Sequence, residues 1–150
     1  MYMLYQKDLQ QVLYLLGKLL GAHNENHNKL FNRGLFSVFK KIPYDKYVLV
    51  CKEIEEEIIL FINELNTIVA TGSEKDCNYA KKIITYLDLF KESVISLSEI
   101  NDSLQYRSEG GRFSRSEYEQ LLNRYEQNEL NRTNQGTVLN EVKSEIFVRN

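Results

Sequence analysis

The chain has 150 residues, of which 43 % are hydrophobic and 27 % are charged, and its formal net charge is −2. This length and composition fit one soluble globular domain, and the near-neutral charge gives no overall field that would attract nucleic acid. One proline and seven glycines are too few for a loop-rich β-sandwich, and they permit long helices.

The two cysteines, Cys51 and Cys77, form neither a disulfide framework nor a zinc motif. The N-terminal residues lack the charged-then-apolar order of a signal peptide, and no apolar run approaches the roughly 18 residues of a membrane-spanning helix. We therefore expect a reduced, cytoplasmic protein without a membrane span.

The first helix is predicted over residues 2–21, with Gly21 as its stop. Its apolar positions recur at helical spacing and are Leu9, Val12, Leu13, Leu16, Leu19 and Leu20. The polar, asparagine-rich run over 23–28 predicts a connection or a frayed helix end. A short, very apolar helix over 30–42 follows, and Pro43 ends it because a proline disfavours the helical conformation in the residue before it.

The longest pattern is an apolar heptad seam within residues 44–70. Its positions alternate between spacings of four and three and are Tyr47, Cys51, Ile54, Ile58, Phe61, Leu65 and Ile68. After a stop at Gly72, Ser73 is the predicted N-cap of a helix over 74–107. The second seam comprises Ala80, Ile83, Leu87, Phe90, Val94, Leu97, Asn101 and Leu104.

A connection this short predicts an antiparallel helical hairpin of the segments 44–70 and 74–107. In such a hairpin Cys51 and Cys77 lie about 24 Å apart along the axis, which is too far for a disulfide. Asn101 interrupts the second seam, so it either sets the register as a buried polar residue or marks where the seam opens to solvent.

Residues 108–112 contain two glycines and predict a flexible joint. Ser114 and Glu117 have the spacing of a capping box, which predicts that a helix starts here, with Tyr118 and Tyr125 on one face.

A stop is predicted over 133–136, before a last short helix over 138–148. The sequence therefore predicts an all-α fold, a five- or six-helix bundle built on the hairpin. We expect one domain over 1–150, with a C-terminal helical subregion over 113–150.

The two histidines, His23 and His27, are four residues apart, so on a helix both imidazoles would share one face and could hold a transition metal. Two ligands are too few for a metal centre, and the histidine motifs of zinc proteases and di-iron bundles are missing. A solvated connection is therefore the favoured interpretation, and a metal-binding helical bundle is the alternative.

Charge is concentrated at three places. The acidic residues Glu53, Glu55, Glu56 and Glu57 lie outside the first seam, as a solvated face or as a docking face for a basic partner. The segment 29–46 is basic and aromatic, which favours a buried packing helix over a membrane or nucleic-acid surface. Arg112 and Arg115 flank the start of the C-terminal helix, where phosphate binding is the alternative to a simple helix start.

Phosphate loops, nucleophile elbows, Cys–His pairs and zinc tetrads are all missing, so we expect no enzyme activity and no cofactor. The sequence predicts a non-enzymatic protein–protein interaction module, such as an adaptor, an inhibitor or an immunity-type regulator. Its partner is predicted to be another protein, and the long heptads also suggest a homodimer. The alternatives are a metal-binding bundle and, less favoured, a nucleic-acid-binding protein. The predicted partner-binding residues are Glu53, Glu55, Glu56, Glu57, Tyr118, Tyr125, Arg112 and Arg115.

Overall fold

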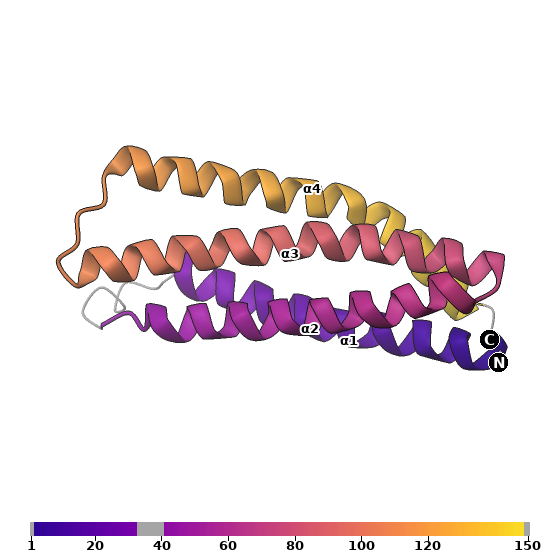
Figure 1. Ribbon diagram of the computed structural model, residues 1–150. Helices are drawn as coiled ribbons and strands as arrows, with labels where there is room; N and C mark the ends of the chain where they lie inside the picture. Colours follow the sequence, from indigo (N-terminus) through magenta and orange to yellow (C-terminus); the bar gives the residue numbers. More distant parts are fainter. Residues whose placement is uncertain (1, 33–40, 149–150) are drawn as a thin grey trace.

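The computed structural model describes the backbone of residues 2–32 and 41–148, and the side chains of 9–32 and 41–148. The described chain forms the helices α1 (Tyr2–Phe31), α2 (Tyr44–Thr71), α3 (Glu74–Ser108) and α4 (Arg115–Val148). Successive helices run antiparallel, and α1 begins and α4 ends at the end of the bundle where α2 meets α3 (Figure 1). The all-α bundle is confirmed, but the expected five or six helices are four in the described residues.

The predicted hairpin is confirmed, because α2 and α3 pack along each other more extensively than any other two described helices. Ser73 caps α3 by accepting a hydrogen bond from the Asp76 N–H at 3.2 Å, and α2 ends before Gly72. Cys51 and Cys77 are both free thiols. In the seam of α2, Val48 is buried in place of Tyr47, whereas the other predicted positions are all buried.

The second seam is buried along its whole predicted length. Asn101 is among its fully buried residues, and its Nδ2 donates to the Leu97 carbonyl at 3.1 Å. The seam has therefore not opened to solvent at this position.

The expected break at Gly21 and residues 23–28 is wrong, because α1 continues through both to Phe31. The Asn26 side chain turns inward, where its Nδ2 donates to the Tyr47 carbonyl at 3.1 Å and to Cys51 Sγ at 3.3 Å. A polar run that finds partners inside the bundle can stay helical, since tertiary contacts override its weak helix propensity.

The expected stop over 133–136 is also wrong, because α4 runs through it to Val148. Beyond the expected stop, Leu139, Val142 and Ile146 are buried, so packing continues the helix. The predicted helix over 30–42 differs as well. Its first two residues belong to α1, its last two are not helical, and 33–40 lie outside the described residues.

Helix α4 starts where the sequence predicts a helix start. The Ser114 N–H donates to the Glu117 carboxylate at 3.2 Å, and the Glu117 N–H donates to Ser114 Oγ at 3.1 Å, which is the predicted capping box. Gly110, in the connection before it, has a φ of 93°, a conformation that favours glycine.

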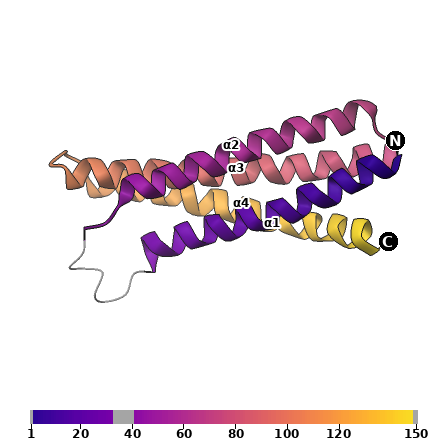
Figure 2. The same ribbon diagram turned by 90° about the horizontal axis from the view of Figure 1, so that it is seen from below.

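Helix α1 lies against the other three helices (Figure 2). It packs less extensively on each of them than α2 and α4 pack on α3. No helix in the described part of the chain is long and apolar enough to cross a membrane. The buried side chains of Leu9, Leu13 and Leu16 hold α1 on the bundle, together with the polar contacts described next.

Candidate functional site

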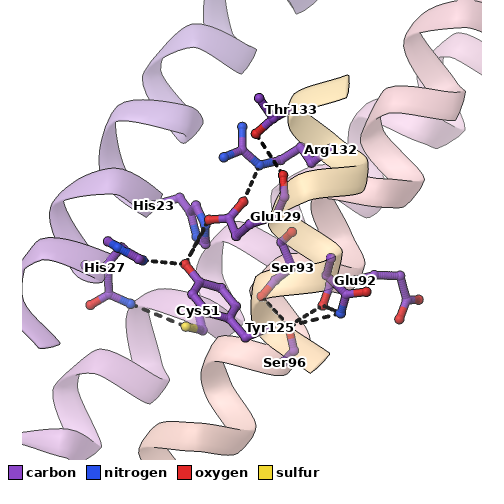
Figure 3. A network of polar contacts seen from close by, with 12 residues as sticks. His23, His27, Cys51, Glu92, Ser93, Ser96, Tyr125, Glu129, Arg132 and Thr133 are labelled. Atoms are coloured by element: carbon purple, nitrogen blue, oxygen red, sulfur yellow. Dashed lines mark hydrogen bonds and ion pairs between the residues drawn. The ribbon is translucent and has the colours of Figure 1, made fainter. Parts of the chain in front are cut away.

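A cluster of polar side chains lies between α1, α3 and α4 in the interior of the bundle (Figure 3). We call it the polar cluster; it consists of His23, His27, Tyr86, Tyr125, Glu129 and Arg132. His23 is 0 % exposed and Tyr125 is 1 % exposed, whereas the side chains of Glu129 and Arg132 are 19 % and 15 % exposed, so the cluster lies at the edge of the core. Buried polar groups are costly unless they are hydrogen-bonded, which makes their partners informative.

The Glu129 carboxylate is the centre of the cluster. Its Oε1 accepts hydrogen bonds from His23 Nε2 and from the Tyr125 hydroxyl, each at 2.8 Å. Its Oε2 accepts from Arg132 Nε at 2.6 Å. One carboxylate thus receives three donors, one of which comes from α1.

These contacts also assign the protons. A phenol has one hydrogen, so when Tyr125 donates to Glu129 its oxygen is left to accept from His27 Nδ1 at 2.7 Å. His27 then carries its proton on Nδ1, and His23 carries its proton on Nε2 toward the carboxylate. Two residues of α1 are therefore joined to one acid of α4, His23 directly and His27 through Tyr125.

The same contacts change the acidity of the cluster. Burial alone would raise the pKa of the Glu129 carboxyl, but hydrogen bonds from His23 and Arg132 and their charges outweigh burial and lower it to about 2. Burial would lower the pKa of Arg132, whereas its bonds to Glu129 and Tyr86 raise it. Burial and the Glu129 charge raise the pKa of Tyr125. The ordinary charge states of the acid and the guanidinium are therefore strongly favoured.

His27 and Cys51 respond mainly to burial. Burial lowers the pKa of His27, the Glu129 charge opposes this, and the charges of His23 and Arg132 add to it. Burial raises the pKa of the Cys51 thiol to about 12, although the hydrogen bond from Asn26 opposes the rise. A thiol this weakly acidic is not an activated nucleophile.

Helix α3 supports the cluster from the other side. Arg132 Nη1 donates to the Tyr86 hydroxyl at 3.0 Å, and the guanidinium lies 5.8 Å from the centre of the Phe90 ring. The His23 ring meets Phe90 edge-on, with their ring centres 5.4 Å apart. The apolar ring of Phe90 thus holds the cation of α4 and an imidazole of α1 in place.

The histidines differ from the solvated connection favoured by the sequence, because both lie on α1 and His23 is fully buried. Their shared helical face is used for hydrogen bonds to Glu129 and Tyr125. Among the described residues, no group of three or more His, Cys, Asp or Glu side chains is arranged to hold a metal.

The remaining predicted residues are not brought together. Glu53, Glu56 and Glu57 are exposed on α2, and Glu55 is half-buried there. At the start of α4, Arg112 and Arg115 are exposed, and Arg115 pairs with Glu119 at 3.1 Å.

The two tyrosines predicted for the partner surface differ. Tyr118 is half-buried against Phe113. Tyr125 belongs to the core, which corrects the expectation that it faces a partner.

A second feature is a groove between α1 and α2 with a volume of about 370 Å³. Its lining residues come from both helices and are Gln11, Val12, Leu15, Phe61, Glu64, Thr67 and Ile68. Apolar side chains dominate this lining, and Glu64 and Thr67 are exposed on its α2 side. The groove therefore combines a largely apolar lining with an acidic residue at its edge.

Comparison with protein-family models, curated proteins and solved structures found no match for this chain. Its function is therefore inferred from the geometry of the polar cluster and the groove.

We expect the free energy of unfolding to fall as the pH is lowered from about 6 to about 2. The Glu129 pKa is about 2 in the fold against an ordinary 4.5, so the unfolded chain binds the proton first as the pH falls. The stabilisation is complete above the ordinary pKa and is lost down to about pH 2, with a loss of at most about 3 kcal/mol. His27 acts in the same direction, because its pKa in the fold lies below the ordinary 6.5.

Urea denaturation at a series of pH values measures this loss. Glu129→Gln should flatten the acidic part of the curve. Glu126→Gln, which changes an exposed residue of the same helix, should leave the curve unchanged. Identical pH profiles for Glu129→Gln and the unsubstituted protein would show that another group causes the acid sensitivity.

Proposed function

We propose that this protein is a non-enzymatic interaction module that binds a basic, amphipathic helical segment of another protein in the groove between α1 and α2. The observation that carries the proposal is the groove itself, with its largely apolar lining and its acidic edge. Grooves of this kind accept the apolar face of a helix while their charged edge selects its polar face.

The acidic edge extends beyond the groove lining. Glu53, Glu57 and Glu64 are spaced by four and seven residues, so they lie along one side of α2. All three are exposed, and none forms an ion pair with a basic side chain among the described residues. Unpaired carboxylates along an apolar groove favour a lysine- or arginine-rich partner and disfavour nucleic acid.

Exposed apolar side chains of α2 also favour this helix as a binding surface. Leu60, which lies between Glu57 and Glu64 in sequence, is 54 % exposed, and Leu49 on the outer side of α2 is also exposed. A second copy of the chain would bring two acidic edges together through this surface, so a different protein fits it better than a homodimer does.

A labelled amphipathic peptide of leucine and lysine, about 18 residues long so that it forms five helical turns, tests the groove by fluorescence anisotropy. We expect binding that weakens with salt, and no binding of the matching leucine–glutamate peptide. The variant Glu53→Lys/Glu57→Lys/Glu64→Lys should weaken binding by about tenfold or more.

The matched control variant, Glu126→Lys/Glu141→Lys/Glu145→Lys, makes the same change of charge at exposed positions of α4. It should retain most of the affinity if the groove is the binding site. If both variants weaken binding equally, the net charge of the protein explains the effect, and the proposal is contradicted. Light scattering of the free protein distinguishes a monomer from the predicted homodimer.

A further inference from the structure

We propose that the polar cluster is an acid-sensitive latch, which holds α1 on the α3/α4 pair and releases it on acidification while α2, α3 and α4 stay together. The inference concerns the motion of α1 and does not depend on the groove having a partner.

The short hydrogen bonds that cross from α1 to α4 within the cluster converge on Glu129. His23 reaches this carboxylate directly, at 2.8 Å. His27 reaches it through the Tyr125 hydroxyl, with separations of 2.7 and 2.8 Å. Among the described residues, two longer polar contacts also join the helices, one from Gln10 Nε2 to the Ile146 carbonyl and one between the Tyr125 hydroxyl and His23 Nε2, each at 3.4 Å. The rings of His23, His27 and Phe31 also lie against Tyr125. One titratable group therefore controls most of the polar attachment of α1 to α4.

The attachment of α4 to α3 does not share this dependence. Asn128 Nδ2 donates to Ser96 Oγ and to the Glu92 carbonyl, each at 3.2 Å, and Arg132 donates to the Tyr86 hydroxyl. Leu139 and Val142 are also buried on the inner side of α4. The α2–α3 hairpin is held by its apolar seams. Protonating Glu129 therefore removes polar contacts of α1 and spares those between α3 and α4, so that α1 is then held mainly by buried apolar residues such as Leu9, Leu13 and Leu16, which is the pattern of a local opening.

The charges around Glu129 give the direction of the change. The titratable groups that face it are His23 and His27 from α1, Tyr86 from α3, and Tyr125 and Arg132 from α4, and Cys51 of α2 acts on Tyr125. When the carboxylate takes up a proton, the cation of Arg132 on α4 loses its anion and faces α1, where its charge disfavours the charged form of His27. The repulsion thus arises across the α1–α4 interface, since like charges without an intervening anion repel.

The size of the effect follows from linkage. The carboxyl pKa is about 2 in the latched state, and release of α1 raises it by removing the hydrogen bond and charge of His23, whereas Arg132 on α4 continues to lower it. The latch therefore weakens as the pH falls toward 3, by less than the about tenfold at pH 3.5 that a full return to the ordinary 4.5 would give. The lowered pKa of His27 adds to this loss.

Cys51 provides a reporter within the chain. Its side chain is 1 % exposed, and its Sγ accepts a hydrogen bond from Asn26 of α1 at 3.3 Å. Release of α1 removes this cover and admits a thiol reagent. The experiment uses the full chain with Cys77→Ser, so that Cys51 is its one thiol, and 4,4′-dithiodipyridine, which reacts with thiols in acid. Rates between pH 7 and 3 are divided by the rate for the denatured chain at the same pH, and circular dichroism follows helicity in parallel.

We expect the normalised rate to rise several-fold, by at most about tenfold, by pH 3.5 while most of the helicity remains. Glu129→Gln should raise the rate already at pH 7 and remove most of its pH dependence. Glu126→Gln, on the exposed side of the same helix, should behave as the unsubstituted chain does.

Three results would overturn the latch. They are a constant rate down to pH 3, exposure of Cys51 only when all helicity is lost, and an unchanged pH dependence in Glu129→Gln. The pH series of the chain with native Glu129 decides the first two without relying on the fold of a cluster variant.

Discussion

Phe90→Ala should lower the free energy of unfolding by about 3 to 5 kcal/mol, the usual cost of removing a buried phenylalanine ring. Phe90 is 0 % exposed and lies in the α3 seam. Its ring contacts His23 edge-on and packs under the guanidinium of Arg132. The substitution therefore leaves a cavity and also removes the apolar support of two polar-cluster residues.

Urea denaturation compares this variant with Phe147→Ala, which deletes the same ring from a position that is 46 % exposed near the end of α4. The control should lose less than about 1 kcal/mol, because nearly half of the side chain is already in water. Equal losses in the two variants would mean that Phe90 does not occupy the centre of the core.

Glu129→Leu should also lower the free energy of unfolding by about 3 to 5 kcal/mol, because it leaves the cation of Arg132 without its anion inside the bundle. The substitution further removes the acceptor of His23 Nε2 and of the Tyr125 hydroxyl. Glu126→Leu, at an exposed position of the same helix, serves as the matched control and should have little effect.

The triple variant His23→Leu/Glu129→Leu/Arg132→Met should regain most of the lost stability, since apolar residues of similar volume often replace a buried ion pair at little cost. Its acid sensitivity should fall at the same time. A triple variant less stable than Glu129→Leu alone would show instead that the polar cluster is a net source of stability.

The hairpin was predictable because its evidence is local. Cys51, Ile54 and Ile58 in α2, like Ile83, Leu87 and Phe90 in α3, follow a period that only a helix places on one side. The short connection at Gly72 and Ser73 then leaves the antiparallel arrangement as the simple solution.

The continuity of α1 and α4 was not predictable in the same way. Asparagine-rich and glycine-containing runs favour helix ends when the chain is considered alone. The deciding contacts come from other helices, such as the Tyr47 carbonyl and the Cys51 sulfur that receive Asn26. A local pattern does not reveal that such partners exist.

The site was predictable only in part. The spacing of His23 and His27 marked one helical face correctly, but their acceptors lie about a hundred positions away in sequence, with a separation of 106 positions between His23 and Glu129. Glu129 and Arg132 have the spacing of an ordinary surface pair, and no sequence signal separated them from the other charges of α4.

Helix α1 contributes side chains to both the groove and the polar cluster. Val12 and Leu15 form one side of the groove, while His23 and His27 of the same helix bind the Glu129 system. A ligand in the groove favours the attached position of α1, and a proton on Glu129 favours the detached one. Two such events are thermodynamically coupled, and the coupling is reciprocal. Acid should therefore weaken the binding of a ligand in the groove. A bound ligand should in turn shift the midpoint of α1 release to lower pH, and the coupling free energy is the same in both directions.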